Sequence, residues 1–328
     1  MTQRELGAAG ITDPTLRRAY TRCRELNAAH GRTYFLATRL LPPDRRPAVH
    51  ALYGFARHVD DLVDQPGQST TPEAISTRID EAERQLAEAL AHDGNALACG
   101  EPVALAVADT VRRYAIDPAL FSAFLTSMRM DLLLRDYPTR ADLQRYTYGS
   151  AQVIGLQLLP VLGTVTDRDE AAPFAAALGD AFQLTNFLRD IAEDLDRGRI
   201  YLPADELAAF GVDRDRLVWC RAHGLADAPV RSALAEQVAT TRAVYHTAAP
   251  GIRMLSPWAQ PCVATAFTLY SEILDRIEYL DYNVFAGRAS VGAARKLRVA
   301  GPAAARAWWV RRSVPVPAEP TRTALPDS

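Results

Sequence analysis

The segment GDAFQLTNFLRDIAEDLDRGRIYLP, which runs from Gly179 to Pro203, decides the fold of this chain. Helical periodicity extends to about Leu195, and the polar residues 196–198 and then Pro203 end it. Most faces of this helix are apolar, which predicts that the helix is buried. One face is different, because it carries amide and carboxylate side chains at helical spacing. This polar stripe consists of Gln183, Asn186, Asp190 and Asp194.

The carboxylates of this stripe need partners if the helix is buried. A divalent cation is a suitable partner for several aligned acids. The alternative is a helix whose acids face solvent or pair with Arg189. This helix alone leaves both interpretations open.

A second acidic helix favours the cation. The segment RHVDDLVD, from Arg57 to Asp64, places Asp60 and Asp64 on one helical face with Asp61 beside them. The residues before it are mostly apolar, so this helix is also predicted to be buried. If the two helices face each other across a cavity, they form an all-oxygen site of the kind that Mg²⁺ prefers. The acids expected to face that cavity are Asp60, Asp64, Asp190 and Asp194.

The composition excludes several other classes of protein. The chain has 328 residues, 48% of them hydrophobic, and a formal net charge of −2, so we expect no nucleic-acid partner. Its four cysteines are scattered, which argues against a zinc site or a disulfide framework and fits the cytoplasm. Neither a Walker loop nor a Rossmann fingerprint is present. The chain starts without an apolar signal core and lacks a run of about eighteen apolar residues, so we expect a cytoplasmic protein without a membrane span.

The rest of the chain predicts helices. Residues 1–13 are expected to be loose, and residues 14–302 to form one helical domain around a central cavity. Residues 139–165 predict one long helix, in which Gly149 and Gly155 mark close packing or a kink. No segment alternates cleanly between β-branched and polar residues, so the predicted fold class is all-α.

The C-terminal part differs in composition. Residues 290–300 predict a short basic helix, and the Pro-rich residues 303–328 predict a largely disordered tail. The sequence WWVRR, residues 308–312, allows two interpretations. We favour packing against the body of the protein, and contact with a membrane surface stays open.

Five further segments stand out beside the two acidic helices. They are HGRTYF (30–35), LLPP (40–43), ALYGFARH (51–58), YTYGSA (146–151) and YSEILD (270–275). Together with the two Asp-x-x-x-Asp motifs, they resemble segments of the squalene/phytoene synthase family, the head-to-head prenyl synthases, in the family's order. The similarity covers roughly residues 20–300, and the run GSAQVIGLQLLP (149–160) looks most like bacterial phytoene synthases. The resemblance implies an isoprenoid-synthase-type helical bundle.

The resemblance also implies which residues act in the site. It implies that Mg²⁺, for which Mn²⁺ can substitute, is held by Asp60, Asp61, Asp64, Asn186, Asp190 and Asp194. It implies binding of a prenyl diphosphate substrate by Thr33, Tyr34, Arg57, Gln183, Asn186, Arg189, Arg199 and Tyr201. It implies catalytic roles for Tyr53, Arg57, Tyr148, Tyr270, Asp60 and Asp190.

The activity implied by the resemblance is the condensation of two geranylgeranyl diphosphates, through prephytoene diphosphate, to phytoene, which commits carbon to carotenoids. Loss of a proton ends this reaction, so no NADPH is expected. The squalene and dehydrosqualene synthases, which use farnesyl diphosphate, are the alternative. A peripheral contact with the inner membrane face, for release of the lipophilic product, and the oligomeric state stay open.

Three other classes of protein fit the sequence less well. A head-to-tail prenyltransferase or terpene cyclase leaves the tyrosine segments unexplained. A di-iron oxygenase needs Glu-x-x-His pairs, which the chain lacks. A non-catalytic helical assembly factor would be expected to lose its motif acids, and both clusters are intact.

Overall fold

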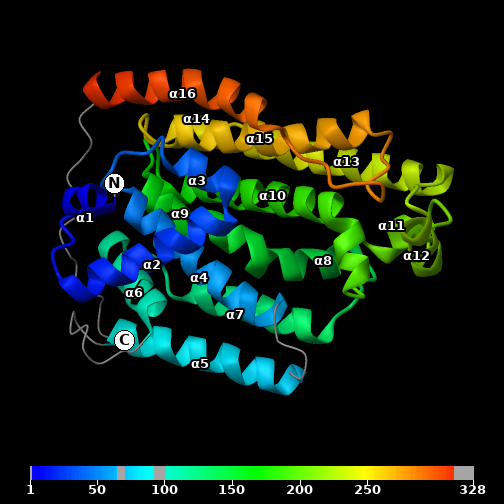
Figure 1. The fold of residues 1–328 in the computed structure, drawn as a ribbon, viewed down its shortest axis with the longest axis horizontal. Helices are drawn as coiled ribbons and strands as arrows, with labels where there is room; N and C mark the ends of the chain where they lie inside the picture. Colours follow the sequence, from blue (N-terminus) through cyan, green and yellow to red (C-terminus); the bar gives the residue numbers. More distant parts are fainter. Residues whose placement is uncertain (1, 65–70, 92–100, 314–328) are drawn as a thin grey trace.

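The segment that carries the polar stripe lies in α10 (Arg168–Asp196), a helix of 29 residues at the centre of the molecule (Figure 1). The structure is a computed structural model, and it describes residues 2–64, 71–91 and 101–313. The side chain of Asp167 caps α10 by accepting a hydrogen bond from the backbone N–H of Asp169 at 2.8 Å. Apolar side chains then bury most of the helix surface, as the sequence predicts.

Every regular element in the described part of the chain is helical. The β-bridges in that part are two isolated ones, Asp136 with Ile200 and Thr164 with Leu255. The all-α, single-domain prediction is therefore confirmed. The helices are α1 (Thr2–Ala8), α2 (Pro14–His30), α3 (Arg32–Thr38), α4 (Arg46–Asp64), α5 (Pro72–Ala91), α6 (Pro102–Tyr114), α7 (Ala119–Leu133), α8 (Arg140–Thr147), the π-helical turn η1 (Tyr148–Gln152), α9 (Val153–Leu162), α10 (Arg168–Asp196), α11 (Ala204–Ala208), α12 (Arg214–His223), α13 (Ala228–Ala248), α14 (Gly251–Met254), α15 (Gln260–Tyr279) and α16 (Ala293–Ser313).

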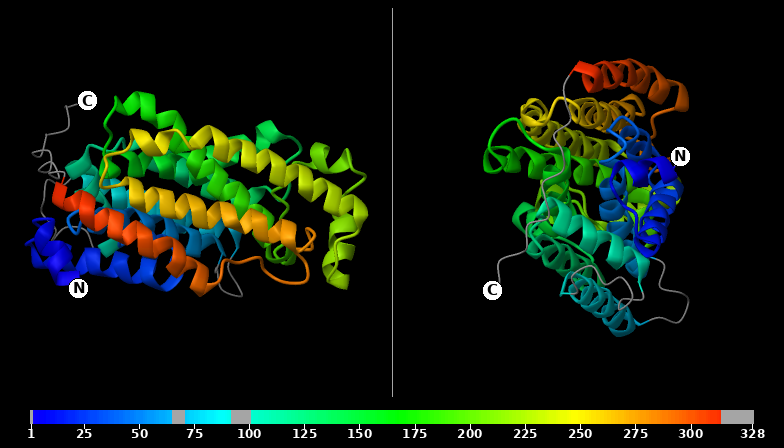
Figure 2. Two further views of the ribbon diagram at one scale, coloured as in Figure 1. Left: turned by 90° about the horizontal axis from the view of Figure 1, so that it is seen from above. Right: turned by 90° about the vertical axis from the view of Figure 1, so that its left-hand side faces the viewer.

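The helices form layers around α10. On one side, α9 packs against α10 and against α4, the helix that carries the other acidic motif. On the other side, α13 and α15 cover α10, and α16 lies outside α15 (Figure 1). Figure 2 shows α16 as the outermost helix on that side of the molecule. In the part of the chain that the structure describes, no helix is both long and apolar enough to span a membrane.

Close backbone contacts fix how η1, α9 and α10 pack. A Cβ atom on Gly149 would lie 2.2 Å from the carbonyl oxygen of Ala123, and one on Gly155 would lie 2.2 Å from that of Ala175. The glycines predicted within the helix at 139–165 therefore mark close packing. The single-helix prediction itself needs correction, because a π-helical turn interrupts the segment at Tyr148–Gln152. Such a turn shifts the direction of every later side chain.

Both ends of the chain differ from expectation. Residues 1–13 were expected to be loose, but α1 packs on the body through Leu6, which is buried, and through an ion pair of Glu5 with Arg46 at 2.9 Å. A disordered tail was expected from residue 303, but residues 303–313 are helical, because α16 extends to Ser313. Small apolar side chains at helical spacing hold α16 on its neighbours, which outweighs the presence of Pro302 inside it. The prediction for residues 314–328 lies outside the described residues.

Candidate active site

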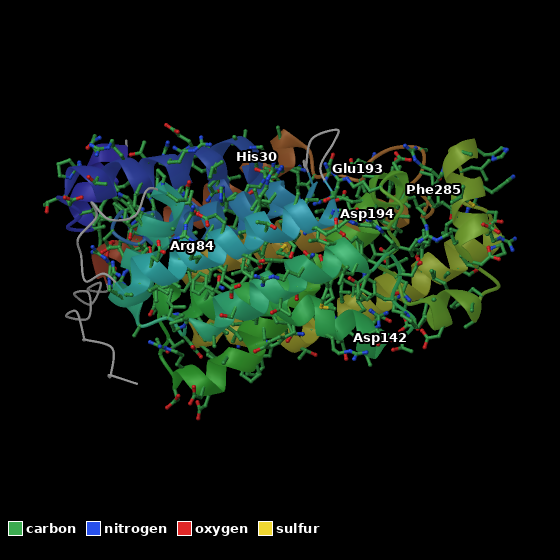
Figure 3. The ribbon with its side chains drawn as sticks, turned by 90° about the horizontal axis from the view of Figure 1, so that it is seen from below. His30, Arg84, Asp142, Glu193, Asp194 and Phe285 are labelled. Carbon is green, nitrogen blue, oxygen red and sulfur yellow. The ribbon has the colours of Figure 1, made fainter. Side chains whose placement is uncertain are left out.

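The two acidic helices meet at a polar cavity of about 860 Å³. α4 contributes Tyr53, Arg57 and Asp60 to its wall. The C-terminal half of α10 contributes its polar stripe from the opposite side. Figure 3 shows Glu193 and Asp194 in this part of α10, with His30 at the end of α2 on the same side of the molecule. Acids from two helices that are far apart in sequence thus face one space, as the sequence predicts.

A second cavity, of about 320 Å³, adjoins the polar one and has an almost entirely apolar wall. It runs along α9 and along the N-terminal half of α10, where Leu158, Leu162 and Phe174 line it. Seven residues belong to both cavities and mark where they join. They are Tyr34, Tyr53, Ala56, Ser150, Ile154, Gln183 and Asn186. The site therefore combines a charged chamber with a long apolar pocket.

The acids of α4 are only partly aligned with the polar cavity. Arg57 donates to Asp60 at 3.1 Å and also forms an ion pair with Asp61. Asp60 lines the cavity, whereas Asp61 is not among the residues of its wall. The reason is helical geometry, since neighbouring residues point about 100° apart. The side chain of Asp64 lies outside the described residues, so its predicted role as a ligand stays a prediction.

Asp190 is held between two guanidinium groups. Arg189 donates to its two oxygens at 2.8 and 2.5 Å, and Arg288, from the loop after α15, donates to them at 2.8 and 3.0 Å. Burial lowers the pKa of Arg189, but the hydrogen bonds and charge of Asp190 outweigh it and raise the pKa above its ordinary value. Arg189 is therefore cationic, and both arginines line the cavity beside the carboxylate. Either can also reach an anion placed in that space.

The oxygen atoms around the cavity suit a magnesium ion that also binds a substrate. The side-chain oxygen of Asn186 is buried and has no hydrogen-bond partner among the described residues, while its amide nitrogen donates to Gln183 at 3.4 Å. Among the residues that the structure describes, no three His, Cys, Asp or Glu side chains lie close enough together to hold a metal ion by themselves. Mg²⁺ usually takes only one or two protein carboxylates and completes its shell with water and phosphate oxygens. The donor set therefore fits Mg²⁺.

Aromatic rings line the junction of the two cavities. The ring of Tyr34 stacks on that of Tyr270, with centroids 5.0 Å apart, and Phe182 lies 4.6 Å from Tyr270. Tyr53 lies 6.3 Å from Tyr34. Burial raises the pKa of Tyr34 well above its ordinary value and that of Tyr53 to about 12. These phenols therefore stay protonated at neutral pH.

Tyr148, predicted to be catalytic, does not lie in either cavity. Its side chain is 47% exposed, and Tyr146 faces the polar cavity instead. Residues two apart on a helix point in nearly opposite directions, so only one of this pair can face inward. The prediction for Tyr148 is therefore wrong in placement.

Tyr146 belongs to a buried network around Asp131 of α7. The phenol of Tyr146 donates to Asp131 at 2.9 Å, and that of Tyr201 lies 3.1 Å from both oxygens of the same carboxylate. Arg199 forms an ion pair with Asp131 at 3.8 Å. Burial, and then the negative charge of Asp131, raise the pKa of Tyr146 well above its ordinary value. The network fixes the orientation of Arg199 and Tyr201, both of which line the cavity.

The residues predicted to bind substrate all lie on the wall of the polar cavity, and their roles stay predictions. These eight residues are Thr33, Tyr34, Arg57, Gln183, Asn186, Arg189, Arg199 and Tyr201. The sequence missed several residues of the same wall: Asp131, Tyr146, Glu193, Arg197, Arg288 and Lys296. Tyr146, Glu193 and Arg197 carried a sequence signal, because they lie within the segments 146–151 and 179–203. Asp131, Arg288 and Lys296 reach the cavity from other parts of the chain.

Comparison with known proteins agrees with this geometry. A sequence profile described as squalene/phytoene synthase matches residues 27–295. The 15-cis-phytoene synthase of Synechococcus elongatus is 38% identical over 297 residues, which cover 86% of this chain and 91% of the relative. The chloroplastic phytoene synthase of Daucus carota is 38% identical over 290 residues, which cover 86% of this chain and 69% of the relative.

Solved structures give the same result for the fold. The crystal structure of a dehydrosqualene synthase superposes with a TM-score of 0.77 at 26% identity, covering 88% of this chain and 96% of the other. That of a squalene synthase from Alicyclobacillus acidocaldarius gives a TM-score of 0.73 at 27% identity, covering 84% and 99%. A charged chamber joined to an apolar pocket, a profile match over most of the chain and these superpositions agree: this chain belongs to the squalene/phytoene synthase family, the head-to-head prenyl synthases.

Proposed function

We propose that this enzyme is a phytoene synthase, which condenses two molecules of geranylgeranyl diphosphate head to head. The observation that carries the proposal is the junction of the two cavities. A prenyl diphosphate has a charged head and a long apolar tail, and the charged chamber opens into an apolar pocket of matching character.

The length of the apolar pocket supports the longer substrate. Along α10 the pocket wall extends from Asn186 at the charged end to Ala171 at the far end. Fifteen helical residues span about 22 Å. From ordinary C–C bond lengths, an extended geranylgeranyl chain measures about 19 Å and a farnesyl chain about 14 Å. This length favours the geranylgeranyl chain, because a farnesyl chain would leave part of the wall without contact.

The charged chamber would bind the diphosphate. Arg57, Arg189 and Arg199 present guanidinium groups to it, and such groups match phosphate oxygens in pairs. Mg²⁺, or Mn²⁺ in its place, would be held by Asp60, Asp190 and Asp194 with the free oxygen of Asn186, and Asp64 is a further candidate. When bound, the metal supplies neutralising charge for the leaving diphosphate. In this account Arg288 binds Asp190 until substrate arrives and then turns to the diphosphate.

The residues at the junction would protect a carbocation. In the proposed reaction one diphosphate leaves, and the double bond of the second molecule attacks the resulting cation. Loss of one proton then closes the cyclopropane ring and gives prephytoene diphosphate. Departure of the second diphosphate, rearrangement and loss of one proton then give phytoene. The rings of Tyr34, Phe182 and Tyr270 offer faces that attract a cation without forming a bond to it. Tyr270 is buried and the other two rings are partly buried, which would limit the access of water to the cation.

The named relatives support the same assignment. Both sequence relatives described above are phytoene synthases, each matched over 86% of this chain. The alternative is a squalene or dehydrosqualene synthase that uses farnesyl diphosphate. The specific observation in its favour is the TM-score of 0.77 with a dehydrosqualene synthase. The two activities differ in substrate length and product, not in the architecture of the site.

The deciding experiment is a product assay. Purified protein is incubated with Mg²⁺ and either geranylgeranyl or farnesyl diphosphate, with and without NADPH, and the extracted hydrocarbon is identified by mass. We expect phytoene from geranylgeranyl diphosphate and no effect of NADPH. Each methylene that farnesyl diphosphate lacks forfeits about 0.8 kcal/mol of burial, so the shorter substrate should react more slowly. Preference for farnesyl diphosphate, with squalene formed only when NADPH is present, would exclude the proposal.

A further inference from the structure

α16 is the outermost helix on its side of the molecule (Figure 2). One face packs on α15 and α3, and the opposite face is turned to solvent. A stripe of small apolar residues holds its inner face against α15 and α3. Arg311 secures its end by donating to the carbonyl oxygens of Leu40 and Leu41, each at 3.2 Å. The residues of the inner stripe are Ala300, Ala303, Ala307 and Val310.

The outer face of α16 carries two exposed tryptophans among arginines. Trp308 and Trp309 are 52% and 63% exposed, although tryptophan is a costly residue to leave in water. The guanidinium of Arg312 lies over the ring of Trp308, 3.8 Å from its centroid, and Arg298 and Arg306 are also exposed. On a helical projection Arg298, Trp309 and Arg312 fall within about 60° of one another, opposite the inner stripe.

The charge on this part of the chain has one sign. Between residues 282 and 318 the sequence contains no Asp or Glu, whereas the whole protein has a net charge of −2. Two basic residues at the start of α16 are occupied elsewhere: Arg295 pairs with Glu272 at 2.5 Å, and Lys296 lines the polar cavity. The arginines on the outer face of α16 are therefore the ones that can contact an anion outside the protein.

The position of this face relative to the apolar pocket suggests its partner. α3 and α15, which support α16, also form pocket wall through Ala37, Cys262 and Ala266. One layer of helices therefore separates the outer face of α16 from the pocket. Tryptophan rings partition into the boundary between water and lipid, and arginines beside them are attracted to anionic headgroups.

We propose that the outer face of α16 (Arg298, Arg306, Trp308, Trp309 and Arg312) docks on the surface of a membrane that contains anionic phospholipids. The tryptophan rings enter the headgroup region, and the arginines contact the phosphates. The helix lies flat on the lipid and does not cross it, because its inner stripe stays packed on α15. The proposal concerns binding and holds whichever hydrocarbon the enzyme makes.

Co-sedimentation with vesicles tests the proposal. The full-length protein is mixed with vesicles of phosphatidylcholine alone or of phosphatidylcholine with phosphatidylglycerol, and the bound fraction is measured. We expect binding only to the anionic vesicles. Removing two arginines (Arg298→Gln with Arg312→Gln) should weaken the partition coefficient by about 25-fold, since each basic residue near the surface contributes about fivefold. Replacing both rings (Trp308→Ser with Trp309→Ser) should weaken it by at least about tenfold.

Matched variants elsewhere on the surface control for loss of charge or of a ring. Arg18→Gln with Arg22→Gln removes two exposed arginines from α2, and Trp219→Ser removes an exposed ring from α12. Both should bind anionic vesicles like the wild type. Either of two results would overturn the proposal: no binding of the wild type to anionic vesicles, or unchanged binding by both α16 variants. The proposal would also be overturned if the protein bound single-stranded RNA as strongly as anionic vesicles and this binding needed the arginines but not the tryptophans. That result would indicate a site for polyanions.

Discussion

At the scale of single residues, the contacts of Asp190 predict what its substitution would do to turnover and to the fold. Its carboxylate accepts hydrogen bonds from Arg189 and Arg288, so it is paired in the absence of metal. We predict that Asp190→Asn lowers turnover at least about 100-fold, because the developing charge on the leaving diphosphate loses its counterion site. The fold should survive, since the amide still accepts from both arginines.

The control for this substitution is Asp196→Asn on the same helix. Asp196 binds Arg221 at 2.7 Å, on the surface and away from the cavity. Turnover of each variant under saturating substrate, with thermal unfolding measured alongside, separates loss of chemistry from loss of fold. Turnover of Asp190→Asn equal to that of Asp196→Asn would count against the proposed role.

The two tyrosines of η1 and the preceding helix give a second prediction at this scale. Tyr146 donates to the buried Asp131, whereas Tyr148 is exposed. Tyr146→Phe removes one donor from a buried carboxylate and should lower kcat by about tenfold or more and stability by about 1–3 kcal/mol. Tyr148→Phe should change neither quantity measurably. Steady-state kinetics and denaturant unfolding check the pair, and the reverse ranking would restore the sequence prediction.

At the scale of helices, packing of α10 against η1 sets the position of the polar stripe. A Cβ atom on Gly179 would lie 2.3 Å from the carbonyl oxygen of Ala151. We predict that Gly179→Ala destabilises the protein by about 1–3 kcal/mol, because the backbones must separate. Gly301→Ala in α16 meets nothing within 4 Å and serves as the matched control. It should be neutral or stabilising by up to about 1 kcal/mol, and equal destabilisation by both in denaturant unfolding would contradict this account.

The contact between α2 and α4 should make stability depend on pH. His50 is buried, accepts a hydrogen bond from Asn27 at 3.0 Å, and has a pKa lowered to about 3 by burial and by Arg24 and Arg46. The folded state therefore holds the neutral ring, while the unfolded chain takes up a proton below about pH 6.5. The contribution of neutral His50 to the free energy of unfolding is complete above pH 6.5. It is lost as pH falls towards 3, at about 1.4 kcal/mol per pH unit.

His50→Gln should remove that part of the acid sensitivity. Between pH 7 and pH 5 the wild type should lose about 2 kcal/mol more unfolding free energy than the variant. His223→Gln, at an exposed histidine that stacks on Trp219, should keep the wild-type dependence. Parallel pH curves for the wild type and His50→Gln would show that His50 does not titrate as described.

The helices were predictable because burial leaves a local periodic pattern. The buried stripes of α10 and α4 are visible within a few turns, and so was the convergence of their acids on one cavity. The direction of Tyr146 was not predictable, because it depends on how α8 packs against α7, where Tyr146 donates to Asp131. Arg288 reaches Asp190 across 98 residues of sequence, and no local pattern encodes such a contact. The length of α16 was missed because its inner stripe is mostly alanine, a weak hydrophobic signal beside Pro302.

At the scale of the whole molecule, the proposed function depends on the arrangement of the two cavities. Acids and arginines from α4 and α10 surround a chamber, and an apolar pocket opens from it. A head-to-head synthase of this kind must release two diphosphates for each hydrocarbon it makes. A head-to-tail prenyltransferase releases one for each condensation and leaves a diphosphate on its product, and a cyclase that acts on one prenyl diphosphate releases one for each product.

The most direct test is therefore the ratio of diphosphate released to hydrocarbon formed. Purified enzyme receives geranylgeranyl diphosphate and Mg²⁺ without NADPH, and both products are quantified from the same reaction, with a parallel reaction in excess chelator as the blank. The account predicts two diphosphates for each molecule of phytoene, and no release in chelator. One diphosphate for each product, or a hydrocarbon that appears only with a reductant, would contradict it.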